Sequence, residues 1–272
     1  MSNSINTNVG AMVALASLRT TQSALSVASK QVQTGYRVSD AQDDASTFSV
    51  AQGIRGNLQA FQAVQGSLAN GVGLGTVTQA ALTNISNLVG NLQAKITQLA
   101  DGSIGNDQRT IYAADFNAMT NQISNFIVQA KYNGVNLLSN NSTSKTFLAD
   151  TSASTITVNN ASTVNTAFTA FQASSVSSVS AATAALTSLT TFGQAVASAL
   201  GTNAADTRTL QLQSNFVNSV VDATTTGLGA IVDADIGKAS ASVQALQVRQ
   251  QLGIQSLSIA NQQPSVLLGL FR

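Results

Sequence analysis

The sequence predicts a mainly α-helical protein whose two ends pair as a long antiparallel helical bundle or coiled coil. Three observations support this fold class. Apolar residues recur every three or four positions over six stretches of the 272-residue chain, which is the period of a helix packed on one face. The repeat is narrowest near the two termini. Two short runs rich in β-branched residues interrupt it in the middle, which predicts a small β-hairpin insert.

The two terminal helices are expected over about residues 4–34 and from about residue 209 past residue 255. Near both termini the apolar positions follow a 3.5-residue spacing, which forms a narrow seam that needs a partner helix. The positions of this terminal seam are Ala11, Leu18, Leu25, Val32, Ile236, Val243, Leu246, Leu257 and Ala260. The ends are therefore expected to pair with each other or with other chains. Pro264 is expected to end or kink the last helix, because proline cannot donate the helical hydrogen bond.

Three further helices are expected over about residues 44–70, 76–100 and 107–131. A bend is predicted between the first two, because glycines stand at alternate positions from Gly71 to Gly75. These glycines superficially resemble a phosphate-binding loop. No strand precedes them and no Lys-Ser or Lys-Thr pair follows, so nucleotide binding is not expected.

The region from about residue 139 to residue 185 is rich in Ser, Thr and Asn and is expected to hold the hairpin and a linker. The strands are predicted at residues 146–148 and 155–158, on either side of a turn-like segment. Helical periodicity resumes over residues 186–200, and a loop is expected at residues 201–209.

The composition excludes most catalytic and metal chemistry. The chain has no Cys, no His and no Glu, so zinc and iron–sulfur sites lack their usual ligands and no imidazole or thiol is present. We therefore expect no enzyme activity, no cofactor and no metal. Asp43 and Asp44 are the one acidic pair. They could bind a cation, but carboxylates at a helix N-terminus, worth about 0.3–1 kcal/mol, are the favoured interpretation, with Arg37 as a nearby partner.

The net charge is +1 and charged residues make up 8% of the chain, which gives no electrostatic footprint for nucleic acid or an anionic membrane. A surface with so few charges suits a protein that packs against copies of itself. No apolar run is long enough for a transmembrane helix, and the N-terminal residues lack the pattern of a cleavable signal peptide.

Several motifs resemble bacterial flagellin and follow the order of that family. The stretch TGYRVSDAQDDA resembles the family's first motif, and YNGVNLL resembles its FNG element. The tail from Leu252 onward resembles its C-terminal signature. The matching positions are Gly35, Arg37, Asp43, Asp44, Asn133, Gly134, Asn261, Pro264 and Arg272. The resemblance covers about residues 1–138 and 205–272. Ser46-Thr47 departs from the family pattern, and the large outer domains have no counterpart, so this is similar to a short flagellin.

The resemblance implies a secreted structural subunit that polymerises into the extracellular flagellar filament for swimming motility, after type III export. Residues 1–34 with 232–272 would form the inner coiled-coil domain, and residues 35–231 the outer helical-bundle domain that carries the insert. The implied partners are other copies of the chain, an export chaperone, the filament cap and hook-junction proteins.

Two alternatives remain. A hook–filament junction protein shares flagellin-like termini, but the short insert and the FNG-like element argue against it. A cytosolic coiled-coil scaffold would explain the seam but not the ordered motifs.

A last expectation concerns detection by the innate flagellin receptor. Detected flagellins present an Arg, a Leu and a Glu on the third and fourth helices, and the matching positions here are Lys95, Leu99 and Asp115. Lys lacks the planar fork of Arg, and Asp holds its carboxylate one methylene further back than Glu. The resemblance therefore predicts poor detection.

Overall fold

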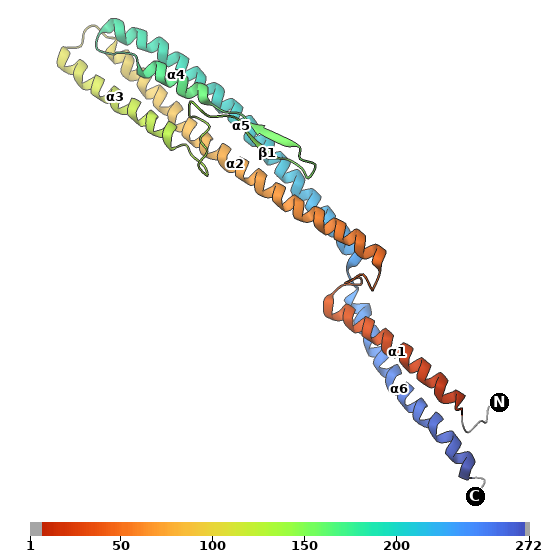
Figure 1. Ribbon diagram of the computed structural model, residues 1–272. Helices are drawn as coiled ribbons and strands as arrows, with labels where there is room; N and C mark the ends of the chain where they lie inside the picture. The colour runs from red at the N-terminus through yellow and green to blue at the C-terminus, as the bar shows by residue number, and fades with distance from the viewer. Residues whose placement is uncertain (1–6, 270–272) are drawn as a thin grey trace. The chain divides into compact units, whose positions relative to one another are not determined.

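The computed structural model describes residues 7–269, and describes side chains as far as residue 262. Within these residues the chain forms six helices and one two-stranded sheet (Figure 1). Its contacts divide it into two compact units. We call residues 1–56 with 223–272 the arm and residues 57–222 the bundle.

The division differs in detail from the predicted domains. The arm includes the loop after residue 34, the first turns of the next helix and the last turns of the helix that ends at Val232. The sequence placed these segments in the outer domain. The inner and outer domains of a filament remain a prediction.

The arm is built on two antiparallel helices, α1 (Val9–Thr34) and α6 (Ile236–Gly269), which lie side by side (Figure 1). Asn8 fixes one end of this pair, where α1 begins. Its side-chain oxygen accepts a hydrogen bond from the Ala11 amide at 3.0 Å, which caps α1. Its amide nitrogen donates to the Ala260 carbonyl at 2.6 Å and so joins the start of α1 to α6.

The bundle is organised around two long helices, α2 (Ala45–Leu99) and α5 (Val179–Val232). They run antiparallel in the bundle, because α2 residues of rising number meet α5 residues of falling number. Two shorter helices, α3 (Asn106–Gln129) and α4 (Ser162–Gln172), complete one end (Figure 1). The sequence analysis missed α4, because its polar stretch resembles the linker around it.

The hairpin consists of β1 (Lys145–Leu148) and β2 (Thr155–Val158), which pair antiparallel and confirm the predicted strands. Hydrogen bonds hold it on the two long helices. The Leu148 amide donates to the Ser67 hydroxyl of α2 at 2.9 Å, and the Gln213 side chain of α5 donates to the Ala149 carbonyl at 2.8 Å.

The core of the bundle has two parts. The larger lies between α2, α3, α4 and α5, and four phenylalanine rings meet there at centroid distances of 5.5–6.0 Å, namely Phe116, Phe168, Phe171 and Phe192. Edge-to-face and stacked ring pairs of this kind favour a well-ordered core. The smaller part lies beneath the hairpin and includes Leu68, Val158 and Leu210.

The predicted bend at Gly71–Gly75 is wrong, because α2 continues through all three glycines. They allow close packing instead. A Cβ added to Gly73 would lie 2.6 Å from the Tyr132 ring, and one added to Gly75 would lie 2.2 Å from the Thr207 hydroxyl. The missing side chains let α5 and the turn before the hairpin approach the α2 backbone.

The predicted loop at residues 201–209 is also wrong, because this segment lies inside α5. Asn203 and Leu210 are buried against α2, so tertiary packing overrides the weak helix propensity of the local Gly, Asn and Asp residues. The helix expected from residue 209 onward is interrupted between Val232 and Ile236. It does not end at Pro264, since α6 continues to Gly269 and a helix can accommodate a proline by kinking.

The close approach at Gly75 gives a testable prediction. We expect Gly75→Ala to lower the free energy of unfolding by about 1–3 kcal/mol, because the new methyl group must displace Thr207. Gly90→Ala is the matched control. It also lies within α2, but its added methyl meets no atom within 4 Å, so it should stabilise by up to about 1 kcal/mol. Thermal unfolding monitored by circular dichroism measures both, and equal stabilisation by the two variants would contradict the assignment.

Candidate assembly surface

The terminal seam forms the contact between α1 and α6. On each helix the partly or fully buried positions alternate at steps of three and four residues: Ala11, Ala14, Leu18, Thr21, Leu25 and Ala28 on α1, and Ala239, Val243, Leu246, Gln250, Gly253, Leu257 and Ala260 on α6. Gly253 lies so close to Leu18 that an added Cβ would be 3.2 Å from its side chain. Two predicted positions, Val32 and Ile236, are exposed near the other end of the pair.

This contact is thin. Ala28 and Ala239 are the buried apolar residues of α1 and α6 among the described side chains, and both are small. The larger seam residues, such as Leu18 and Leu257, are only half-buried. Since hydrophobic stabilisation follows the apolar area removed from water, the two helices gain little from their own pairing.

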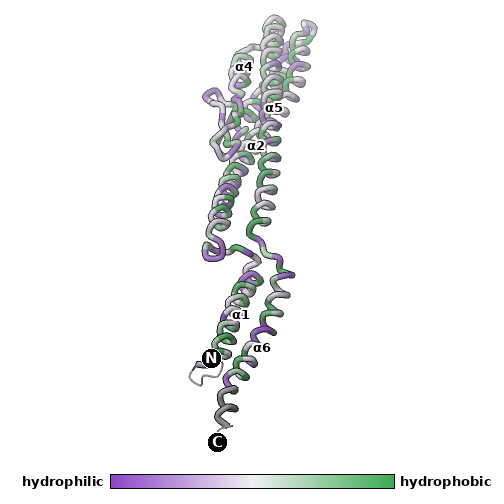
Figure 2. Tube along the Cα trace, turned by 90° about the vertical axis from the view of Figure 1, so that its right-hand side faces the viewer, coloured by the Kyte–Doolittle hydropathy of each residue, from purple (hydrophilic) through white to green (hydrophobic). Residues whose placement is uncertain are grey.

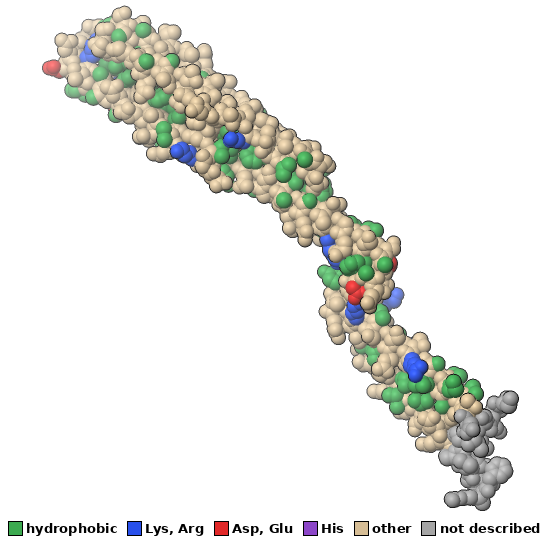
Figure 3. Space-filling view, viewed as in Figure 1, with side chains coloured by type: hydrophobic (Ala, Val, Ile, Leu, Met, Phe, Trp, Pro, Cys, Tyr) green, Lys and Arg blue, Asp and Glu red, His purple; other side chains and the backbone are tan. Residues whose placement is uncertain are grey.

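Large apolar side chains also lie on the faces of the arm that point away from the seam. We call them the outer stripe: Val9, Met12, Val13, Leu15 and Val27 on α1, and Val248, Leu252, Ile254 and Ile259 on α6. Each is between 37% and 65% exposed. Figure 3 shows apolar side chains gathered over this pair, and the hydropathy colouring of Figure 2 shows that hydrophobic residues recur along both helices. An extended exposed apolar surface of this kind is typical of an interaction site.

The sequence analysis missed the outer stripe. The signal was present, because Leu252 and Ile259 are seven residues apart, as are the seam residues beside them. A second apolar row on one helix indicates a second partner surface, whereas a single heptad seam accounts for only one row.

The loop after α1 ties the arm together at the opposite end. Gly35 has a φ of 75°, which a residue with a side chain rarely adopts, and it ends α1. The Gly35 carbonyl accepts from the Ala234 amide at 2.9 Å. The Arg37 guanidinium donates to the Ile231 carbonyl at 2.5 Å. Arg37 thus binds the last turn of α5, and forms no direct bond to Asp43 or Asp44.

Asp44 caps α2, as the helix-start interpretation predicted. One of its carboxylate oxygens accepts from the amides of Ser46 and Thr47 at 3.0 and 3.1 Å, and the other accepts from the Thr47 hydroxyl at 2.5 Å. These bonds lower the pKa of Asp44, with the Thr47 hydroxyl the largest cause. Ser46-Thr47, which departs from the family pattern, therefore completes the cap.

Asp43 belongs to a separate polar cluster centred on Lys30. The Lys30 ammonium lies 2.6 Å from the Asp40 carboxylate and 2.9 Å from that of Asp43. Asp43 also accepts from the Ser39 amide and hydroxyl, both at 2.9 Å. Lys30 holds the pKa of Asp43 and Asp40 below the usual range of a carboxyl, and the two carboxylates raise the pKa of Lys30. The sequence analysis did not single out Lys30.

The remaining motif positions lie in three places. Asn133 and Gly134 have φ values of 47° and 78° and form a tight turn closed by two 2.9 Å hydrogen bonds between Tyr132 and Val135. Asn261 is exposed on α6. Pro264 lies in the α6 backbone, and its side chain is outside the described part. Arg272 lies outside the described residues.

The three candidate receptor positions lie near the contact between α2 and α3. The Lys95 ammonium is 2.8 Å from the Asp115 carboxylate and 4.7 Å from the centre of the Tyr112 ring. Leu99 is fully buried in the core, so it is not presented with the other two as the resemblance implied. Its carbonyl accepts a hydrogen bond from the Arg109 guanidinium, which also donates to the Asp101 carbonyl at 3.0 Å and so caps the end of α2.

In the part of the chain that the structure describes, no helix is both long and apolar enough to cross a bilayer. The same residues contain no group of three side chains able to hold a metal ion.

The fold and the arm define a class of protein, a helical subunit with paired termini and an exposed apolar surface. Comparisons identify its family. Residues 5–143 match the bacterial flagellin N-terminal helical region, and residues 179–271 match the bacterial flagellin C-terminal helical region. The chain belongs to the bacterial flagellin family and is a structural subunit of the flagellar filament, not an enzyme.

The similarity to individual flagellins extends over the whole chain. It is 36% identical to flagellin FljK of Caulobacter vibrioides over 99% of both chains. It is 33% identical to a flagellin of Brucella melitensis, again over 99% of both. The crystal structure of Bacillus cereus flagellin shares the fold, with a TM-score of 0.50 and 19% identity over 56% of this chain and 88% of that one.

The Lys30 cluster predicts a pH dependence of the loop at residues 35–44. Because the pKa of Asp40 and Asp43 is lowered, the stability they contribute is complete above about pH 4 and is lost as the pH falls through the lowered values. Because the pKa of Lys30 is raised, its contribution is complete below about pH 10.4 and is lost as the pH rises through the raised value.

We expect the Ser39 and Asp40 amide resonances to change on acidification below about pH 4. In Asp43→Asn the acid transition should be weaker, because the carboxylate that accepts hydrogen bonds from Ser39 is replaced by an amide, which does not ionise. Asp150→Asn, which alters the hairpin turn, is the control and should leave the transition unchanged. An identical transition in wild type and Asp43→Asn would exclude the cluster as its cause.

Proposed function

We propose that copies of this flagellin associate through the outer stripe of the arm, and that the terminal seam forms the helix pair on which the stripe is displayed. The observation that carries the proposal is the set of large apolar side chains left exposed on both α1 and α6. The seam pairs helices within one chain, so it cannot also satisfy a neighbouring subunit. The stripe holds most of the large apolar side chains that remain exposed on α1 and α6, where Val32 and Ile236 are also exposed.

The energetics favour this assignment. Burying a fully exposed Val, Leu, Ile or Met side chain contributes about 1.5–3 kcal/mol. The nine stripe residues are 37–65% exposed, so each can gain about half of that on association. Association costs translational and rotational freedom, which reduces the gain, but a polymer repeats the contact at every subunit. The segments that carry the stripe, residues 9–27 and 248–259, contain two charged residues, Arg19 and Arg249, so burying the stripe adds little desolvation cost.

The proposal includes the layout that the family implies. Residues 1–34 with 232–272 would line the inside of the filament, and residues 35–231 would lie further out. Besides other copies of the chain, the proposed partners are an export chaperone, the filament cap and hook-junction proteins. The destination is the extracellular filament, reached by flagellar type III export, where the polymer serves swimming motility.

The stripe predicts a defect in polymerisation that leaves the monomer intact. We expect the double variant Leu252→Asp and Ile259→Asp to keep the helix content of the monomer, since both side chains are exposed. It should form no filaments on seeding, because two charges per subunit would be buried without partners. Electron microscopy and light scattering of seeded monomer measure this. Asn141→Asp, in an exposed loop, adds charge without changing shape and should polymerise normally.

The seam variant Leu257→Asp separates the two roles. Leu257 is half-buried, so its loss costs toward the lower end of about 2–5 kcal/mol, and the added charge costs more. This variant should lose helix content in the monomer as well as filaments. Filaments of normal length from the stripe variant would refute the proposed surface, whereas failure of unmodified monomer to polymerise would refute self-assembly itself.

We also propose that the innate flagellin receptor detects this chain poorly. The ion pair between Lys95 and Asp115 and the burial of Leu99 support this, because the two charges satisfy each other and the leucine is inaccessible. In a receptor reporter assay, purified monomer should give a weak response. Lys95→Arg with Asp115→Glu should raise it only partly while Leu99 stays buried. Full potency from the unmodified chain would overturn the proposal.

A further inference from the structure

One buried side-chain amide between α2 and α5 has only half of its hydrogen-bonding groups satisfied. Asn203 is 3% exposed, and its nitrogen donates to the Gly75 carbonyl and to the Gln79 side-chain oxygen, both at 2.9 Å. Its own side-chain oxygen is buried and has no hydrogen-bond partner among the described residues. Burying a polar atom without a partner costs free energy, so this side chain needs another explanation.

The contact between the two helices is periodic. Buried positions at this contact follow steps of three and four residues on α2, namely Val64, Leu68, Gly71, Gly75, Thr78, Leu82 and Ile85. On α5 the same steps run through Leu189, Phe192, Val196, Ala199 and Asn203, and steps of seven then lead to Leu210 and Val217. A surface that repeats every seven residues can also pack when displaced by seven residues, about 10.5 Å along the helix. Apolar side chains discriminate weakly between such alignments, because each of them buries similar area.

Asn203 makes the alignments unequal, because in the native one its amide faces the carbonyl of a glycine, Gly75. Gly75 has no side chain, and a Cβ there would lie 2.2 Å from the Thr207 hydroxyl of α5, so its carbonyl is open to the Asn203 amide. One heptad away in either direction, the position equivalent to Gly75 is Leu68 or Leu82, and both are fully buried. In a displaced alignment the Asn203 amide would face a leucine and lose its hydrogen bonds.

The other polar contacts near this layer discriminate less. Thr78 and Thr120 are the other buried polar residues of the described chain, and each hydroxyl bonds within its own helix, to Leu74 and Phe116. Gln65 bonds Asn218 across the two helices at 2.6 Å, but that pair is exposed, so water can replace it.

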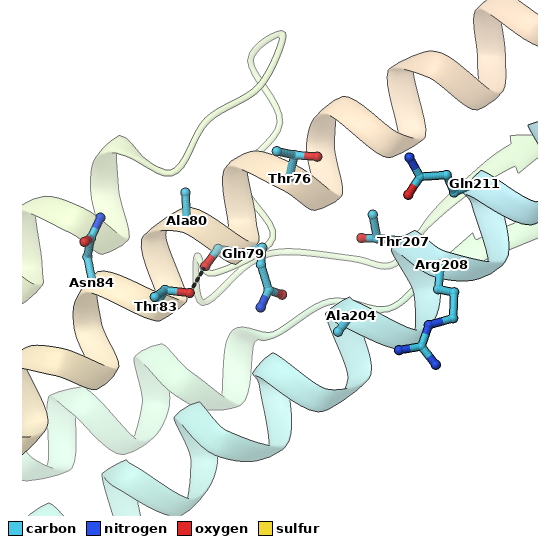
Figure 4. A pocket seen from close by; sticks show the side chains of 9 residues that line it. All are labelled: Thr76, Gln79, Ala80, Thr83, Asn84, Ala204, Thr207, Arg208 and Gln211. Atoms are coloured by element: carbon cyan, nitrogen blue, oxygen red, sulfur yellow. Dashed lines mark hydrogen bonds between the residues drawn. The ribbon is translucent and has the colours of Figure 1, made fainter.

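We infer that Asn203 selects the alignment of α2 with α5, and that it does so without stabilising the fold. In coiled coils a single buried asparagine is known to fix the register of the helices at a cost in stability. Removing the Asn203 amide leaves neither of its acceptors buried without a hydrogen bond. The Gly75 carbonyl lies within α2 and keeps its helical hydrogen bond. Gln79 lines a groove of about 680 Å³ between the helices, with Thr207 across from it, and can turn toward solvent there (Figure 4).

The absence of cysteine from the chain allows a direct test of alignment. Cysteines at Gln65 and Asn218 report the native alignment, because these side chains are in contact. Cysteines at Gln65 and Gln211, or at Val72 and Asn218, report displacement by one heptad in either direction. Each double-cysteine chain is refolded from denaturant and treated with a thiol-specific crosslinker shorter than the displacement of about 10.5 Å.

With Asn203 present, we expect crosslinking at the native pair only. In Asn203→Leu the yield at a displaced pair should rise at least severalfold, while the midpoint of thermal unfolding stays the same or rises. Asn203→Ala removes the amide without adding bulk, and should also relax the alignment if the leucine variant folds poorly. Thr78→Val is the matched control, because it removes a buried hydroxyl that bonds only within α2, and it should crosslink at the native pair alone.

Two outcomes would overturn the inference. Crosslinking confined to the native pair in both Asn203 variants would show that apolar packing and the hairpin already fix the alignment. A lowered unfolding midpoint in Asn203→Leu, with the native pair retained, would show that Asn203 is an ordinary stabilising contact.

Discussion

Every part of this structure depends on pairing helices that are far apart in the sequence. In the arm α1 pairs with α6, and in the bundle α2 pairs with α5. Such pairing requires the two halves of the chain to carry complementary seams at matching distances from the turn-around. The elements between α2 and α5 supply that turn-around, and the phenylalanine cluster holds it together.

The two pairings differ in what they bury. The bundle closes over leucine, isoleucine and phenylalanine side chains that are fully removed from water. The arm closes mainly over alanine and half-exposed residues, and keeps larger apolar side chains outside. This distribution of buried and exposed apolar side chains suits a subunit whose bundle has its own core and whose arm buries its remaining apolar surface in a polymer. In the proposed assembly, the exposed apolar area that would be a liability in a monomer drives its association.

Much of this architecture could be predicted from the sequence, because helical periodicity and the hairpin signal are local. The C-terminal end of α1, both ends of α3, both strands and the Asp44 cap followed from pattern and propensity alone, whereas α1 begins at Val9 and not near residue 4. The predictions failed where tertiary contacts decide the outcome. Glycines at residues 71–75 resemble a break until Tyr132 and Thr207 are seen to need the space. Likewise, no local signal reveals that Lys30 gathers Asp40 and Asp43.

The placement of the aromatic residues has a spectroscopic consequence. The chain has no tryptophan and three tyrosines, so tyrosine alone determines its near-ultraviolet emission. Tyr36 lies in the arm beside the Arg55 guanidinium, at 5.9 Å from ring centre to cation. Tyr112 lies beside Lys95, and Tyr132 lies against Gly73 beneath the hairpin. Each ring lies in a different region. The loss of emission in a single Tyr→Phe variant therefore gives the contribution of that region to the intrinsic fluorescence, without any added label.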